Sequence, residues 1–97
     1  MSIFVRIPIP FRALVEGQRE IALGVNPYGY TSIREVMNIL SRRYGGPIRD
    51  RIIDEKHEQR LGVGLFLNGE DIRSLHGLES RVKPGDVVKI LPESVAV

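Results

Sequence analysis

The stretch TSIREVMNILSRRYGGP, residues 31–47, contains the clearest signal for a helix in the chain. Its large apolar residues recur at intervals of three and four, which places them on one face of an α-helix. Ser32 and Glu35 have the spacing of a capping box, in which each side chain satisfies a free amide of the other residue, and Gly45–Pro47 end the helix. At about 1.5–3 kcal/mol for each buried large apolar side chain, this face is expected to be a major stabiliser of the fold. It consists of Ile33, Val36, Met37, Leu40 and Tyr44.

Two strands are predicted before this helix. Residues 3–7 alternate between two sets of side chains, which is the period of a half-buried strand. Pro8 and Pro10 end that strand, VEGQ at residues 15–18 is typical of a turn, and residues 19–23 alternate again. The pattern predicts a hairpin with a long connection.

The segment directly after the helix predicts a short helical extension and a polar loop. Residues 48–54 are expected to add one or two helical turns, with three isoleucines facing inward, and residues 55–60 form the loop. Gly62–Gly64 precede no helix and therefore do not form a phosphate cradle; they favour a bulge or a close approach to the backbone. The inward isoleucines are Ile48, Ile52 and Ile53.

The rest of the chain predicts two further strands and a short one. Residues 63–67 alternate and end at Asn68–Gly69, the strongest short hairpin signal, and residues 87–91 form the last strand. The order strand, strand, helix, strand, short strand, strand predicts an α+β fold. We expect one mixed sheet of four to five strands packed on one main helix.

The composition is that of one ordinary globular domain. The chain has 97 residues, of which 42% are hydrophobic and 27% are charged, with a net charge of +2. No run approaches the roughly 20 apolar residues that span a bilayer, and the first residues lack the pattern of a signal peptide. We therefore expect a cytoplasmic protein without a membrane partner. The chain has no cysteine, so thiol catalysis and disulfides are excluded.

No constellation of residues predicts a catalytic or metal centre. His57 and His76 match no metal-ligand spacing, and Glu70–Asp71 are adjacent carboxylates of a kind favoured in turns. Arginines cluster near the end of the helix without interleaved aromatic residues, so nucleic-acid binding is not expected. We therefore expect a carrier protein or an interaction module rather than an enzyme. The clustered arginines are Arg42, Arg43, Arg49 and Arg51.

Four stretches together resemble the MoaD/ThiS family of ubiquitin-like sulfur carriers. The resemblance covers residues 3–92 and includes the N-G-E-D-I turn and the G-D-x-V-x-I-x-P ending. The IPIPFR start and the loop at residues 55–60 resemble a longer subgroup, which includes carriers linked to cysteine biosynthesis, beside the small subunit of molybdopterin synthase. The stretches are VRIPIPFR (5–12), SIREVMNILSRRYGG (32–46), LFLNGEDIRSLHGLESRV (65–82) and KPGDVVKILP (83–92).

The resemblance implies a ubiquitin-like β-grasp domain at residues 1–92 and a flexible C-terminal tail at residues 93–97. In this family an E1-like enzyme adenylates the terminal carboxylate with ATP and Mg, and sulfur then replaces an oxygen to give a thiocarboxylate. The large subunit of molybdopterin synthase, or another sulfur-accepting enzyme, receives the sulfur. The carrier itself binds no cofactor and is not catalytic. The carrier tail would be Ser94, Val95, Ala96 and Val97.

The tail departs from the family pattern at its last two positions. The family's terminal Gly-Gly falls at Ala96 and Val97, and a β-branched valine is stiff and bulky. The only Gly-Gly of this chain is Gly45–Gly46, at the end of the helix. Three interpretations stay open: a carrier whose activating enzyme accepts Ala-Val, a carrier-derived binding subunit or adaptor, and an altered tail.

One face of the sheet is predicted to bind a partner. Alternation places one set of side chains toward the helix and the other outward. Within the outward set, Phe4, Val87 and Leu91 are expected to form one apolar patch with Arg6 and Lys89 at its rim, which is typical of a recognition surface. Scattered exposed apolar residues are also common. The inward set is Ile3, Val5, Ile7, Leu65, Leu67, Val88 and Ile90. The outward set is Phe4, Arg6, Phe66, Val87, Lys89 and Leu91.

Overall fold

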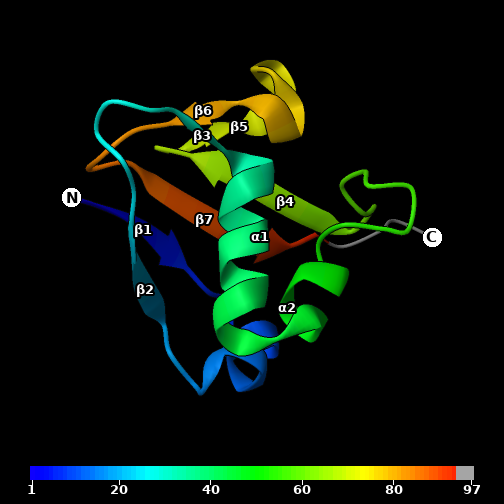
Figure 1. Cartoon of the computed structure of the whole chain (residues 1–97). Coiled ribbons are helices and arrows are strands. Elements are labelled where there is room, and N and C mark those ends of the chain that lie inside the picture. Colours follow the sequence, from blue (N-terminus) through cyan, green and yellow to red (C-terminus); the bar gives the residue numbers. More distant parts are fainter. Residues whose placement is uncertain (94–97) are drawn as a thin grey trace.

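A computed structural model describes residues 1–93, and in it five strands form one mixed sheet in the order β2-β1-β7-β4-β5 (Figure 1). The central strands β1 and β7 pair in parallel, whereas all the other neighbours pair antiparallel. The sheet confirms the predicted α+β fold with a mixed sheet. The strands are β1 (Ser2–Arg6), β2 (Glu20–Gly24), β4 (Val63–Leu67), β5 (Glu70–Asp71) and β7 (Val87–Pro92).

The main helix α1 (Ile33–Tyr44) runs across one face of this sheet (Figure 1). Four of its five predicted inward residues are fully buried, whereas Tyr44 is half-buried and its hydroxyl accepts a hydrogen bond from Gln18 Nε2 at 3.0 Å. Because its side chain is partly exposed and its hydroxyl is hydrogen-bonded, Tyr44 lies at the edge of the core rather than inside it. The buried residues are Ile33, Val36, Met37 and Leu40.

Only half of the predicted capping box forms at the start of α1. Ser32 Oγ accepts a hydrogen bond from the Glu35 amide at 3.1 Å, as predicted. The Glu35 carboxylate does not reach back to Ser32; it accepts hydrogen bonds from Arg42 Nη2 and Asn38 Nδ2 instead. Ser32 belongs to β3 (Thr31–Ser32), which pairs with β6 (Arg81–Val82), a small ladder that the sequence did not predict.

The second helix is shorter and earlier than predicted. α2 (Gly46–Asp50) begins directly after α1, whereas the sequence predicted helical turns over residues 48–54. Helical hydrogen bonds continue just past α2, from the Arg51 and Ile53 amides to the carbonyl oxygens of Pro47 and Arg49, so part of the predicted turn is present. Asp54 Oδ1 then accepts hydrogen bonds from the amides of Lys56 and Glu58, which closes a loop. The three isoleucines nevertheless point inward as predicted: Ile48, Ile52 and Ile53 are each at most 1% exposed.

The connection between β1 and β2 contains a 3-10 helix that the sequence did not reveal, η1 (Ile9–Val15). Pro10 lies within its first turn, where a missing amide costs no hydrogen bond. Phe11 and Val15 are buried and fix η1 against the core. Glu16 and Gly17 then take left-handed backbone angles, which confirms the predicted turn at residues 15–18.

The predicted hairpin between β4 and β5 is confirmed. Asn68 and Gly69 have φ angles of 51° and 85°, as a two-residue turn of type I′ requires. The Asn68 side chain also donates to Asp86 Oδ1 at 3.0 Å and accepts from the Val87 amide at 2.9 Å, so the turn is fastened to the start of β7.

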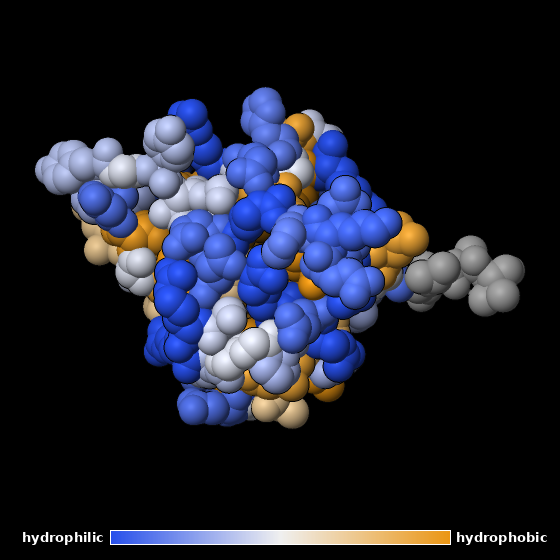
Figure 2. All heavy atoms as spheres, turned by 45° about the vertical axis from the view of Figure 1, so that its right-hand side comes forward, coloured by the Kyte–Doolittle hydropathy of each residue, from blue (hydrophilic) through white to orange (hydrophobic). Residues whose placement is uncertain are grey.

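The core lies between the sheet and α1. The predicted inward set is buried, with Leu67 half-buried and packed against the core. The face drawn in Figure 2 is mostly hydrophilic, with apolar residues at its lower end, where η1 lies in Figure 1. None of the helices in residues 1–93 is long and apolar enough to cross a membrane.

We expect Leu40→Ala to lower the free energy of unfolding by about 2–5 kcal/mol, because Leu40 is fully buried on α1 and truncation leaves a cavity. Tyr28→Ala is the control, since Tyr28 is 97% exposed, and should change stability by less than about 0.5 kcal/mol. Urea denaturation followed by circular dichroism measures both. Equal effects of the two substitutions would contradict the placement of α1.

Candidate functional site

The six outward residues predicted to bind a partner lie on β1, β4 and β7, on the sheet face opposite the inward set. Arg6 and Lys89 are exposed, and the four apolar members are half-buried. The strand register places Arg6 beside Lys89, and Lys89 beside Phe66. These three side chains therefore form one row across the sheet. We call the six residues together the outer face: Phe4, Arg6, Phe66, Val87, Lys89 and Leu91.

Phe4, Val87 and Leu91 do not form the single patch that the sequence predicted. Phe4 is the register partner of Val87, so these two side chains are neighbours. Leu91 lies farther along β7, opposite Gly64 and diagonal to Phe66. The apolar residues therefore form two separate pairs on different sides of Arg6 and Lys89: Phe4 with Val87, and Leu91 with Phe66, which itself belongs to the row. Alternation gives the face that a residue occupies, but only the register between strands gives its neighbours.

Gly64 on β4 provides space on the outer face. A Cβ at this position would lie 2.7 Å from Glu93 Oε1 and 3.0 Å from Phe66 Cε2. Both distances are shorter than ordinary van der Waals contacts, so the absence of a side chain lets the Glu93 carboxylate and the Phe66 ring lie over the strand. This confirms the predicted close approach to the backbone.

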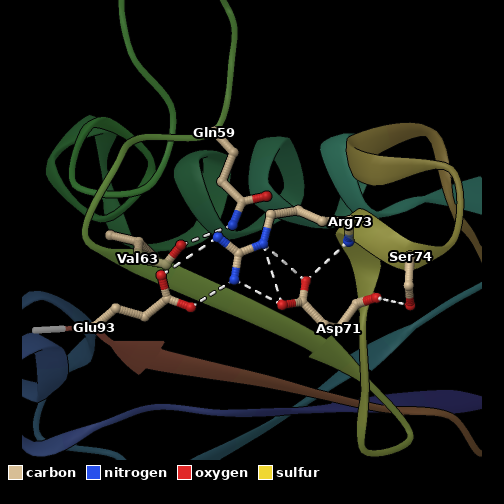
Figure 3. Close-up of polar contacts among 6 residues, drawn as sticks. All are labelled: Gln59, Val63, Asp71, Arg73, Ser74 and Glu93. Atoms are coloured by element: carbon tan, nitrogen blue, oxygen red, sulfur yellow. Dashed lines mark hydrogen bonds and ion pairs between the residues drawn. The ribbon is translucent and has the colours of Figure 1, made fainter. Parts of the chain in front are cut away.

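Arg73, in the short 3-10 helix η2 (Ile72–Ser74), links Glu93 to Asp71 (Figure 3). Its Nη2 donates to Asp71 Oδ2 and to Glu93 Oε1, each at 2.7 Å. Its Nε lies 3.1 Å from both oxygens of Asp71. The Glu93 amide also donates to the Gly62 carbonyl oxygen at 2.7 Å. Glu93 is thus held through its side chain and its backbone.

This contact sits at the base of the predicted carrier tail. Glu93 is the last residue that the structure describes, and the predicted tail residues Ser94, Val95, Ala96 and Val97 lie outside the described residues. The chain therefore enters the tail from a fixed point beside the outer face. Arg73 and Glu93 are 20 residues apart and no local pattern joins them, so the sequence did not single out Arg73.

The charged groups of this contact shift the pKa values of one another. Hydrogen bonds from the Arg73 side chain, and then from its amide, lower the pKa of Asp71, and the two carboxylates raise the pKa of Arg73. Both ion pairs lie at the surface, with Arg73 54% exposed and the two carboxylates 31% and 32% exposed, where such pairs contribute little to stability. The contact with Arg73 therefore orients the Glu93 side chain and does little to stabilise the fold.

The two histidines considered from the sequence lie apart from this base. His76 lies in a hollow of about 760 Å³ beside η3 (Gly77–Glu79), together with Asn68 and Lys83. His57 lies in the loop after α2, where its carbonyl oxygen accepts from Arg34 Nη1. Within residues 1–93, no group of three or more His, Cys, Asp or Glu side chains could hold a metal ion.

The chain is similar over nearly its whole length to a known carrier. It is 31% identical to the sulfur carrier protein CysO of Mycobacterium tuberculosis over 94 residues, which cover 95% of each chain. The crystal structure of M. tuberculosis CysO superimposes with a TM-score of 0.82 at 28% identity, covering 95% of this chain and 99% of the other. No protein-family model matches the chain.

A second solved structure contains a related chain in a complex. A chain of the Amycolatopsis orientalis BexX/CysO complex superimposes with a TM-score of 0.80 at 28% identity. The match covers 98% of this chain and 99% of the other. A relative of the present chain is thus crystallised together with BexX.

We expect Arg73→Gln to raise the pKa of Asp71 toward its ordinary value, because the hydrogen bonds that favour the carboxylate are lost. The depressed pKa stabilises the fold above the ordinary value of about 4; this stabilisation is lost as the pH falls through the folded-state pKa. A carboxyl carbon NMR titration measures the change. Arg42→Gln is the control, since it should raise the pKa of Glu35 instead. An unchanged Asp71 titration in Arg73→Gln would contradict the contact.

Proposed function

The chain belongs to the MoaD/ThiS family of ubiquitin-like sulfur carriers, and from this membership we propose that its C-terminal carboxylate carries sulfur. The relatives that establish the family are sulfur carrier proteins, which are not catalytic themselves. In the proposed reaction the Val97 carboxylate attacks the α-phosphate of ATP and releases pyrophosphate. A sulfur donor then displaces AMP and leaves a thiocarboxylate. An E1-like enzyme supplies the catalytic groups, with ATP and Mg as its own cofactors.

The absence of cysteine supports chemistry at the carboxylate. A carrier without a thiol cannot hold sulfur as a persulfide, whereas a terminal carboxylate needs no particular side chain in the carrier. The domain must therefore present the tail to the active site of a partner enzyme. The fixed position of Glu93 serves this purpose, and it is the observation that carries the proposal.

The short distance between Glu93 and the reacting end limits where the partner docks. With Val97 as the reacting residue, four residues follow Glu93, and four extended residues span at most about 14 Å. The partner's active site therefore lies within this distance of Glu93. The outer face adjoins Glu93 through Leu91 and Gly64, so we propose it as the docking surface for the activating enzyme and for the sulfur acceptor.

We favour an acceptor of the cysteine-biosynthesis type over the large subunit of molybdopterin synthase. The support is the similarity to CysO over 95% of the chain, together with the resemblance of the IPIPFR start to the longer carrier subgroup. The crystallised BexX/CysO complex also supports stable binding of a partner to a carrier of this size.

A binding subunit or adaptor without carrier chemistry is the second candidate function, and one observation favours it. Ala96 and Val97 stand where the family has Gly-Gly. Glycine lets a backbone pass close to other atoms, whereas the β-branched Val97 is wide and stiff at its first side-chain torsion. An adaptor would use the outer face alone and would bind its partner without residues 94–97.

Intact mass spectrometry separates the two functions. We expect the native chain, incubated with the E1-like enzyme, Mg-ATP and a sulfur donor, to gain the mass of an oxygen-to-sulfur exchange. A variant with Ala96→Gly and Val97→Gly should react faster, because the narrower tail enters the active site more easily. A chain truncated after Glu93 is the control and should not react. If only the diglycine variant reacts, the native chain is not a carrier and the adaptor function holds.

We expect Phe4→Asp with Leu91→Asp to abolish binding to the activating enzyme, because both apolar pairs of the outer face then carry a negative charge. Tyr28→Asp with Tyr30→Asp is the matched control, since these tyrosines are exposed and lie off the outer face. Isothermal titration calorimetry measures binding, and circular dichroism checks the fold. Native affinity in the folded Phe4/Leu91 variant would remove the outer face as the docking surface.

A further inference from the structure

A groove of about 530 Å³ lies between η1 and the neighbouring ends of β1, β2 and β7. Its charged lining residues come from all four elements or the turn beside them: Arg6, Arg12, Arg19, Glu20 and Lys89. We call this hollow the basic groove. It shares Arg6, Lys89 and Leu91 with the outer face, but most of its lining lies beyond that face, toward η1.

Positive charge is concentrated in the basic groove. Four cations and one carboxylate line it, whereas the whole chain has a net charge of only +2. The remainder of the molecule is therefore slightly acidic. Like charges gathered in one hollow repel one another, and a negatively charged ligand relieves this repulsion.

The cations of the groove are only partly neutralised by the protein itself. The Arg6–Glu20 pair is long, at 3.4 Å, and both side chains are about half exposed, at 58% and 47%. Arg12 Nε donates to the Ile7 carbonyl oxygen, which brings no negative charge. Within residues 1–93, Arg19 and Lys89 make no side-chain hydrogen bond or ion pair. Most of the positive charge is therefore available to a ligand.

The rim of the groove adds an apolar contact. Ile9, at the start of η1, is 75% exposed. η1 is a firm support for it, because Phe11 and Val15 are buried and the Arg51 guanidinium lies 4.9 Å from the centre of the Phe11 ring. The groove thus offers cations and an exposed aliphatic side chain on a packed element.

We propose that the basic groove binds an acidic segment of a partner protein that also carries aliphatic side chains. Carboxylates of the segment would pair with Arg19 and Lys89, and an aliphatic side chain would pack on Ile9. A nucleic acid fits less well, because no aromatic residue lines the groove for base stacking. Binding here needs no reaction at the tail, so the proposal holds for a carrier and for an adaptor.

The test is an NMR titration of the nitrogen-15-labelled full chain with the blocked peptide Ac-Glu-Leu-Glu-Asp-Leu-Glu-amide. We expect the largest amide shifts at Arg6, Arg19 and Lys89, and a Kd that rises with salt. Arg19→Glu with Lys89→Glu should raise the Kd at least about tenfold. Lys56→Glu with Lys83→Glu is the control, because it changes the net charge equally at exposed lysines outside the groove. We expect it to change the Kd less than about twofold.

Three results would overturn the proposal. The first is equal binding of Ac-Gln-Leu-Gln-Asn-Leu-Gln-amide, which lacks the carboxylates. The second is an equal loss of affinity in the control variant, which would show that only net charge matters. The third is tighter binding of a ten-nucleotide oligothymidylate than of the acidic peptide at the same amides. If charge reversal unfolds the chain, Arg19→Gln with Lys89→Gln tests the same contacts with less repulsion.

Discussion

Parallel pairing of β1 with β7 brings the first and last strands side by side at the centre of the sheet. Parallel strands need a long crossover, and α1 lies within it and packs on one face. The pairing aligns Phe4 with Val87 and Arg6 with Lys89, so the outer face combines residues more than 80 positions apart. Because β7 is central and leads directly to Glu93, the sheet sets both the proposed docking surface and the point where the predicted tail begins.

The base of the tail is fixed by contacts that contribute position rather than stability. Gly64 leaves room for the Glu93 carboxylate, and Arg73 binds that carboxylate from the side of Asp71. The two functions that we propose therefore meet at one end of β7: recognition by the outer face and presentation of the reacting carboxylate. A carrier requires both, whereas an adaptor requires only the first. The substitution of Gly-Gly by Ala96 and Val97 bears on the chemistry and leaves the recognition surface unchanged.

Local patterns predicted the elements whose cause is local. Apolar spacing predicted α1, and the Asn68–Gly69 dipeptide predicted the hairpin, because both depend on nearby residues. Features that depend on distant partners were missed. The 3-10 helix η1 depends on burial of Phe11 in the core. The Arg73–Glu93 contact depends on the pairing of β7 with β4. The outer face combines a local and a distant cause. Alternation along each strand predicted its residues, but the register between strands, which separates its apolar pairs, could not be predicted.

The central claim is that the outer face and Glu93 together form the functional end of the molecule. Amide and methyl NMR shifts of the labelled chain, on addition of its unlabelled activating enzyme, test this claim most directly. The account predicts that the largest changes occur at Phe4, Leu91 and Glu93, with little change along the exposed side of α1. Changes centred on Asn38 and Arg42 of α1, with the outer face unaffected, would contradict it.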